Sequence, residues 1–324
     1  MNGTGAAAIR LDQVRKVFGG TVAVDRLSLK IPAGELVVLI GPSGCGKSTV
    51  LRMINRLIEP TSGQMFVGDE EITRADPVQL RRRIGYVIQH VGLFPHQTVR
   101  ANVATVPKLV GWPKAKTNAR VDELMDLVGL DPARYAGRYP HELSGGQRQR
   151  IGVARALAAD PVVLLMDEPF SAVDPIVRGR LQDEFLRLQR TVGKTIVFVT
   201  HDVDEAVRLG DRIAVLSEGG KLEQYGTPAE LLSKPANPFV ADFVGADRGI
   251  KRLAVTPIPA AGLAPLPPGA DGYPVVDAGG NLRDALAHLL EGDTGWVGVR
   301  RDGTPQEILT LDDIYSELRA AVRP

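Results

Sequence analysis

Five short apolar segments alternate along this chain with stretches of helical periodicity, and this alternation restricts the possible folds more than any other feature. The segments lie at 35–41, 83–89, 162–168, 195–201 and 212–219. Continuous apolar runs of this length are typical of strands buried on both faces of a sheet. We therefore predict an α/β fold with a largely parallel sheet.

The pattern changes twice along the chain. Between about 99 and 159 the spacing is helical and no segment is a convincing strand, which predicts a helical insert between two core strands. Six prolines then interrupt the pattern at 256–274. We predict one large domain at 8–245 that contains the insert, a Pro/Ala-rich linker at 246–274, and a small C-terminal domain at 275–324.

The C-terminal segment has the pattern of a small α/β unit. Residues 281–292 read as an amphipathic helix capped by Asn281, residues 296–303 as a strand and turn, and residues 310–322 as a second helix.

Charge and cysteine content exclude several classes of protein. The chain has 39 Lys and Arg against 38 Asp and Glu, a net charge of +1, so we expect no broad basic face and no nucleic-acid partner. The single cysteine, Cys45, excludes an internal disulfide framework and is typical of a reducing compartment. No signal-like segment is present, and no apolar run approaches the length of about 18 residues that a spanning helix needs. We expect a cytoplasmic chain that does not span a membrane.

The sequence GPSGCGKST follows the first apolar segment and precedes a helix, the context that the phosphate-loop pattern G-x-x-x-x-G-K-[ST] requires. Backbone amides of such a loop surround the β-phosphate, while Lys47 reaches the β and γ oxygens and Ser48 binds Mg²⁺. Cys45 lies near Lys47 and a helix N-terminus, surroundings that favour alkylation of a thiol, so we expect a maleimide to inactivate the chain and Mg·ATP to slow that inactivation. The loop residues predicted to bind nucleotide are Gly41, Ser43, Gly44, Cys45, Gly46, Lys47, Ser48 and Thr49.

Polar residues follow three other apolar segments, at the strand ends where ligands bind in open α/β sheets. Asp167 is the candidate Mg²⁺ ligand, and Glu168 could polarise a water for attack on the γ-phosphate. His201 could touch the γ-phosphate, and the Gln89 amide could reach Mg²⁺ or the attacking water. Catalytic roles are therefore predicted for Glu168, His201, Lys47 and Gln89, and metal binding for Ser48, Gln89 and Asp167.

A second phosphate-binding pattern occurs in HELSGGQRQR, at 141–150. A glycine pair at a helix start directs free N–H groups and the helix dipole at an anion, yet this segment has no lysine. It offers neutral donors only, from Ser144, Gly145, Gly146 and Gln147.

These motifs, in this order, resemble the ATP-binding subunit of an ABC transporter over about residues 8–245. The resemblance implies an ATPase with ATP and Mg²⁺ as cofactors, and an aromatic ring, here Phe18, stacked on adenine. It also implies a head-to-tail dimer in which Ser144–Gln147 of one chain closes over the nucleotide held by a second copy. Asp174 resembles the residue that communicates across that interface.

The resemblance extends to one group of importers. Residues 84–114 and 237–253 are similar to ATPase subunits that serve uptake of glycine betaine, choline, carnitine or proline betaine. Such a subunit lies on the cytoplasmic face of the inner membrane, with separate permease subunits and a substrate-binding protein. Leu93 and Phe94 would contact the permease coupling helix, or alternatively fill the core of the insert.

Alternatives remain at the level of solute and class. The chain could serve an importer of another solute such as an amino acid, or an exporter; a non-transport ABC protein is disfavoured by the single cassette and the lack of sustained heptads. The C-terminal segment resembles a single cystathionine-β-synthase-type repeat, so a complete two-repeat nucleotide pocket is not expected within one chain. The tail could instead be a dimerisation element, because the tails of two copies in a dimer could pair.

Overall fold

The structure, a computed structural model, describes residues 5–89, 92–171 and 173–320. Two compact units are present: Met1–Asp202 together with Leu209–Glu223, and Val203–Arg208 together with Gln224–Pro324. In the described residues, no helix combines the length and apolar character needed to cross a bilayer.

A six-stranded sheet forms the core of the first unit, in the order β10-β9-β3-β8-β7-β6. All five residues of β3, β7 and β8 are buried, which explains their continuous apolar sequence. The pairs β9/β3, β3/β8, β8/β7 and β7/β6 are parallel, so their carboxyl ends meet at one edge. The predicted parallel sheet is confirmed. Its strands are β3 (Leu36–Ile40), β6 (Ile84–Val87), β7 (Val163–Asp167), β8 (Thr195–Val199), β9 (Arg212–Ser217) and β10 (Lys221–Gly226).

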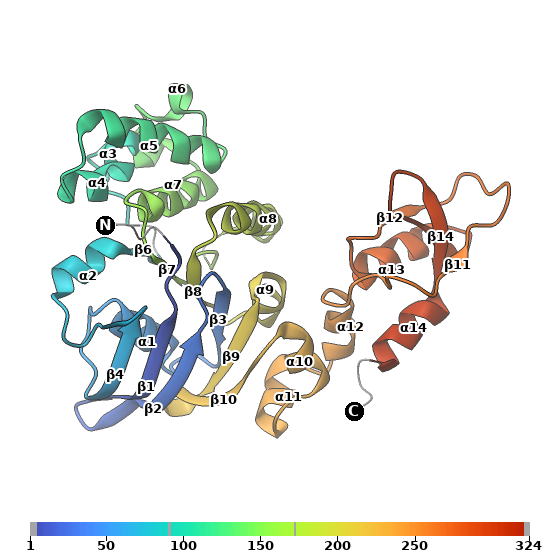
Figure 1. Cartoon of the computed structure of the whole chain (residues 1–324), viewed down its shortest axis with the longest axis horizontal. Helices are drawn as coiled ribbons and strands as arrows, with labels where there is room; N and C mark the ends of the chain where they lie inside the picture. The colour runs from blue at the N-terminus through green and yellow to red at the C-terminus, as the bar shows by residue number, and fades with distance from the viewer. Residues whose placement is uncertain (1–4, 90–91, 172, 321–324) are drawn as a thin grey trace. The chain divides into compact units, whose positions relative to one another are not determined.

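A second, antiparallel sheet of four strands has the order β2-β1-β4-β5. Figure 1 shows β2, β1 and β4 in that order. This sheet was not predicted from the sequence, because its strands alternate buried and exposed residues and several register shifts interrupt that alternation. The strands are β1 (Ile9–Phe18), β2 (Thr21–Ile31), β4 (Ser62–Val67) and β5 (Glu70–Glu71).

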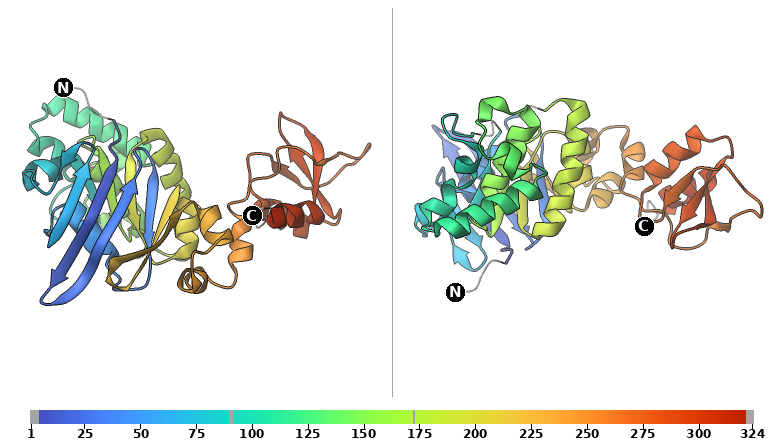
Figure 2. Two further views of the ribbon diagram at one scale, coloured as in Figure 1. Left: turned by 60° about the horizontal axis from the view of Figure 1, so that its bottom comes forward. Right: turned by 90° about the horizontal axis from the view of Figure 1, so that it is seen from above.

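Helices occupy the segment predicted as a helical insert, and Figure 2 shows these green helices lying together in the view from above. The fully buried Asn102 stabilises the entry to this insert, because its amide donates to the carbonyls of Phe94, Gln97 and Thr98. The insert contains α3 (Val99–Val103), α4 (Thr105–Leu109), α5 (Lys114–Leu127), α6 (Pro132–Tyr135), η1 (Pro140–Glu142) and α7 (Gly145–Leu157). The other helices of this unit are α1 (Lys47–Ile54), α2 (Pro77–Arg83) and α8 (Pro175–Val192), with a 3-10 turn, η2 (Glu218–Gly220).

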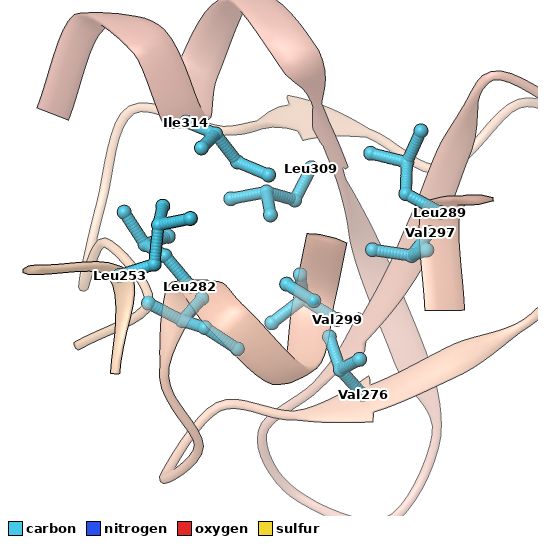
Figure 3. Packing of buried hydrophobic residues seen from close by; sticks show 10 residues of the cluster. Leu253, Val276, Leu282, Leu289, Val297, Val299, Leu309 and Ile314 are labelled. Carbon is cyan, nitrogen blue, oxygen red and sulfur yellow. The ribbon is translucent and has the colours of Figure 1, made fainter. Parts of the chain in front are cut away.

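The second unit has its own sheet, in the order β11-β14-β13-β12, and its own apolar core. Figure 3 shows the core side chains pointing toward one another. Asn281 caps α13 as predicted, since its side chain accepts from the Arg283 and Asp284 amides. The elements are α9 (Val203–Leu209), α10 (Pro228–Ser233), α11 (Pro238–Val244), α12 (Arg248–Leu253), β11 (Ala264–Pro265), β12 (Val275–Asp277), α13 (Leu282–Glu291), β13 (Trp296–Arg300), β14 (Pro305–Thr310) and α14 (Leu311–Ala320).

The segment 246–274 differs from the expected linker. It contains α12 and β11, and its residues Leu253 and Ile258 belong to the buried cluster of the second unit. The Leu282 amide also donates to the Thr256 carbonyl at 2.9 Å. Prolines interrupt regular structure but leave the apolar residues between them free to face a core, so proline content alone overstates the length of a linker. The cystathionine-β-synthase-type resemblance of the tail stays a prediction.

Candidate functional site

The phosphate loop between β3 and α1 depends on a glycine at its last turn. Gly46 has φ 108° and is the N-cap of α1. A Cβ at this position would lie 2.5 Å from the Ala23 carbonyl oxygen, so only glycine fits. Because Gly46 brings no capping side chain, the first N–H groups of α1 stay available to an anion.

Lys47 begins α1 and is 5% exposed. Its ammonium donates to the Gly41 carbonyl at 2.7 Å and to the Pro42 carbonyl at 2.9 Å. The loop therefore holds the charge within the turn that the motif predicts. Ser43 and Gly44 are exposed on the same loop, and Thr49 is half-buried in α1.

The thiol of Cys45 does not have the exposure that we expected. Cys45 is 2% exposed, and a Cβ added to Gly41 would lie 2.8 Å from its sulfur. Burial blocks access of a reagent whatever the surrounding charge, so the expectation of ready alkylation is corrected.

Ser48 and Asp167 are joined across the edge of the sheet. The Ser48 hydroxyl donates to the Asp167 carboxylate at 2.8 Å. Burial raises the pKa of Asp167, while the Ser48 hydrogen bond and the Arg52 charge oppose that rise. A hydroxyl and one carboxylate fit Mg²⁺ bound together with a nucleotide, because this ion takes one or two carboxylates and completes its shell with phosphates and water. In the part of the chain that the structure describes, no group of three or more His, Cys, Asp or Glu could hold a metal ion.

Glu168 is the centre of a second group of contacts. Its carboxylate lies 3.4 Å from the Gln89 amide nitrogen and 3.3 Å from His201 Nδ1. These side chains come from the carboxyl ends of β6, β7 and β8, as the parallel topology requires. The structure thus brings together three of the four residues for which catalytic roles were predicted.

Two residues near Asp167, Arg52 and Tyr86, were not predicted from the sequence. Arg52 and Tyr86 both interact with the Asp167 carboxylate, and burial, followed by the Asp167 charge, raises the pKa of Tyr86. Arg52 follows Ser48 by four positions on α1, so helical spacing could have placed it on the same face. The sequence carries no comparable signal for Tyr86.

Ser144 and Gln147 form a capping box at the start of α7. The Ser144 hydroxyl accepts from the Gln147 amide at 3.2 Å, and the Gln147 side chain accepts from the Ser144 amide at 2.9 Å. Gln147 also donates to the Tyr135 hydroxyl at 3.3 Å. These described contacts all lie within the insert, and Ser144 and Gly145 are exposed, Gly146 half-buried. None of these bonds joins the start of α7 to the phosphate loop of the same chain, and the exposed Ser144 and Gly145 face solvent.

Three other predicted residues have exposed positions. Phe18, at the end of β1, is 46% exposed, with the Lys16 ammonium 4.7 Å from its ring centre. Asp174 is exposed just before α8. Phe94 is 40% exposed, so it does not fill the core of the insert, whereas Leu93 is half-buried. His90 and Val91, in the stretch expected to contact a permease, lie outside the described residues.

Comparison with known proteins decides the family. Residues 24–171 match the ABC transporter family. The glycine betaine uptake system ATP-binding protein YehX of Escherichia coli (strain K12) is 50% identical over 311 residues, which cover 95% of this chain and 99% of that protein. The chain belongs to the ABC transporter family.

Two further relatives of this ABC transporter protein differ in the solute that they are named for. The glycine betaine/carnitine/choline transport ATP-binding protein OpuCA of Bacillus subtilis (strain 168) is 58% identical, over 75% of this chain and 64% of its own length. A sulfate/thiosulfate import ATP-binding protein of Nocardia farcinica is 48% identical, over 73% of this chain and 70% of its own. The match with this chain therefore spans just under two thirds of the length of OpuCA.

A solved structure shares the cassette fold. It is a dimeric ATP-binding cassette in a post-hydrolysis state bound to ADP and Pi, 33% identical, with a TM-score of 0.60 over 68% of this chain and 98% of that one.

Proposed function

We propose that this ABC transporter protein hydrolyses ATP to drive import of a quaternary-amine osmoprotectant through a separate permease. One observation carries the ATPase assignment: the pairs Ser48–Asp167, Gln89–Glu168 and His201–Glu168 converge at the sheet edge beside the phosphate loop. The names of the two betaine-related relatives support the solute class.

The chain's own residues would share the work of hydrolysis. Lys47 and the loop amides bind the β and γ phosphate oxygens. Glu168 orients a water and accepts its proton as the water oxygen bonds to the γ-phosphorus, while the bond to the β-phosphate oxygen breaks and ADP leaves. His201 contacts the γ-phosphate. Ser48, Asp167 and Gln89 would hold Mg²⁺, which would neutralise phosphate charge when bound.

A complete site would need a second copy of the chain. The outward-facing start of α7 would supply Ser144, Gly145, Gly146 and Gln147 to the partner's nucleotide, which already has a lysine from its own loop. Phe18 would stack on adenine with its exposed ring, and Asp174 would lie at the interface. The dimeric neighbour bound to ADP and Pi supports this arrangement.

The proposed position in the cell is the cytoplasmic face of the inner membrane. The permease would contact the chain near Phe94, whose 40% exposure leaves an apolar surface available. A substrate-binding protein would deliver the solute. The sulfate/thiosulfate relative favours one alternative, an importer of another solute, because a similar cassette serves a chemically different cargo there.

The first test replaces the proposed general base. Glu168→Gln keeps the side-chain shape but cannot accept a proton, so ATP should still bind, hydrolysis should fall by about 100-fold or more, and a dimer should accumulate with ATP on size exclusion. Wild-type turnover in this variant would remove Glu168 from the mechanism.

The second test addresses the solute. In vesicles with the permease and the binding protein, ATPase activity should rise on addition of glycine betaine or choline. Stimulation by sulfate or an amino acid instead, with no response to quaternary amines, would assign the chain to another importer group.

A further inference from the structure

Gln149 is a buried polar residue of α7 that the proposed reaction does not use. It is 4% exposed, and its side-chain amide donates to the carbonyl oxygen of Pro169, the residue directly after Glu168. We propose that Gln149 is a positioning residue, which holds the Glu168–Pro169 turn from the helix that carries Ser144–Gln147.

The turn at Glu168 requires support. Glu168 has φ 45°, a left-handed conformation that costs energy for a non-glycine residue, and the proline that follows further restricts its backbone. The Glu168 amide donates to the Val199 carbonyl at 3.0 Å, and the Ser171 hydroxyl donates to the Glu168 carbonyl at 2.9 Å. The first of these bonds comes from β8 of the core sheet, and the second lies within the turn itself. Gln149 holds the next carbonyl from the insert.

This bond connects two parts of the proposed machinery. Gln149 lies two positions after Gln147 on the same helix, so a movement of the α7 start is transmitted to the Glu168 backbone through one rigid turn. In the dimer on which this inference rests, α7 engages the partner's nucleotide while Glu168 serves its own chain's nucleotide. Occupation of one composite site is thereby coupled to the position of the base in the other.

The bond can be removed with little change of shape. In the chain of 324 residues, Met at position 149 has a volume similar to that of Gln but no hydrogen-bond donor. The kcat of Gln149→Met should therefore fall by about 10- to 100-fold, because a catalytic base displaced by about 1 Å loses activity on this scale. Equilibrium binding of ATP should stay close to wild type, because the phosphate loop is untouched. A wild-type kcat in Gln149→Met would overturn the proposal.

A pH profile separates positioning from general loss of structure. In Gln149→Glu the acid can donate to the Pro169 carbonyl only when protonated, and burial raises the pKa of such a carboxyl. As the pH is lowered from about 8 to about 6, the activity of Gln149→Glu relative to wild type at the same pH should rise. The relative activity of Gln149→Met should stay constant over this range. Parallel profiles of the two variants would contradict a hydrogen-bonding role.

Mixed dimers locate the effect. In a dimer with Lys47→Ala on one chain, the working site uses Lys47 and Glu168 of the other chain. Gln149→Met should reduce turnover when it is placed on the chain with the intact Lys47. The same change placed on the Lys47→Ala chain should have little effect on turnover. The reverse ranking would mean that Gln149 acts by shaping the phosphate-binding start of α7.

A stability control uses the same helix. Val153→Ala removes a buried side chain of α7 that has no bond to Pro169, so it should lower Tm without the pH-dependent recovery. Normal hydrolysis in Glu168→Gln would reject the proposed function itself. Loss of activity in Glu168→Gln together with wild-type behaviour of Gln149→Met would reject only the role of Gln149.

Discussion

At the scale of single residues, the site depends on backbone and burial states that are unfavourable in isolation. Glu168 adopts a left-handed conformation ahead of a proline, and Asp167 carries its carboxylate at 7% exposure. Both are held by neighbouring donors, Ser171 for Glu168 and Ser48 for Asp167. Such costs are typical of functional sites, where geometry matters more than local stability.

The buried Asp167 predicts a pH-dependent stability difference. Its pKa is raised above the ordinary 3.8, so its contribution to stability is fully present below about pH 3.8 and is lost as pH rises through the raised value. Asp167→Asn keeps an acceptor for Ser48 without the charge, so its free energy of unfolding near pH 7 should exceed that of wild type.

Urea unfolding at several pH values measures this difference, which should shrink as the pH falls toward 3.8. The same variant should lose Mg²⁺-dependent hydrolysis. A variant less stable than wild type at neutral pH would show that the Arg52 and Ser48 contacts outweigh the cost of burial.

At the scale of elements, capping side chains determine where helices begin. Ser144 caps α7, Thr227 caps α10 and Asn281 caps α13, each by accepting from amides of the first turn. The cap of α7 also fixes the conformation of the glycine pair that would meet a phosphate. Local chemistry therefore sets both the boundary of this helix and its binding geometry.

The cap of α13 predicts the stability of the C-terminal unit. The Asn281 oxygen accepts from two amides, each at 3.0 Å. Asn281→Ala should lower the stability of this unit by about 1 kcal/mol, read from faster hydrogen exchange in α13. Asn281→Ser, which restores an acceptor, is the control; equal exchange in the two variants would exclude the cap as the cause.

At the scale of the whole molecule, the proposed reaction involves two chains. The phosphate loop and the base belong to one surface of the first unit, whereas the described bonds of Ser144 and Gln147 stay within the insert. In the proposed dimer, this helix start would offer the Gly145 and Gly146 amides but no lysine, and the other chain would bring the nucleotide together with its own Lys47.

Mixed dimers test this composite site. Lys47→Ala and Gly145→Asp on different chains place both defects in one site, so ATP-dependent closure and hydrolysis should survive in part. The same two changes on one chain, opposite a wild-type partner, damage both sites and should nearly abolish activity. Because the two sites of a dimer can work cooperatively, the number of bound ATP molecules should be measured together with turnover. Higher activity in the second arrangement would mean that each α7 serves its own chain.

Features that depend on neighbours in the sequence could be read from the sequence. The parallel strands followed from apolar runs, the phosphate loop from a motif between strand and helix, and the Asn281 cap from its place before an amphipathic segment. Lys47 and Ser48 were named from that motif. Asp167, Glu168 and His201 were named because strands of one parallel sheet end at a common edge.

Contacts between distant segments depended on packing that no local pattern encodes. The burial of Cys45, the tie between Gln149 and Pro169, and the inclusion of Leu253 and Ile258 in the C-terminal core are such contacts. The Gln149 bond joins α7 to the turn after β7, and the C-terminal core joins Leu253 and Ile258 to residues as distant in the sequence as Ile314. Periodicity specifies which face of an element is apolar, but only the assembled core specifies which partner covers that face.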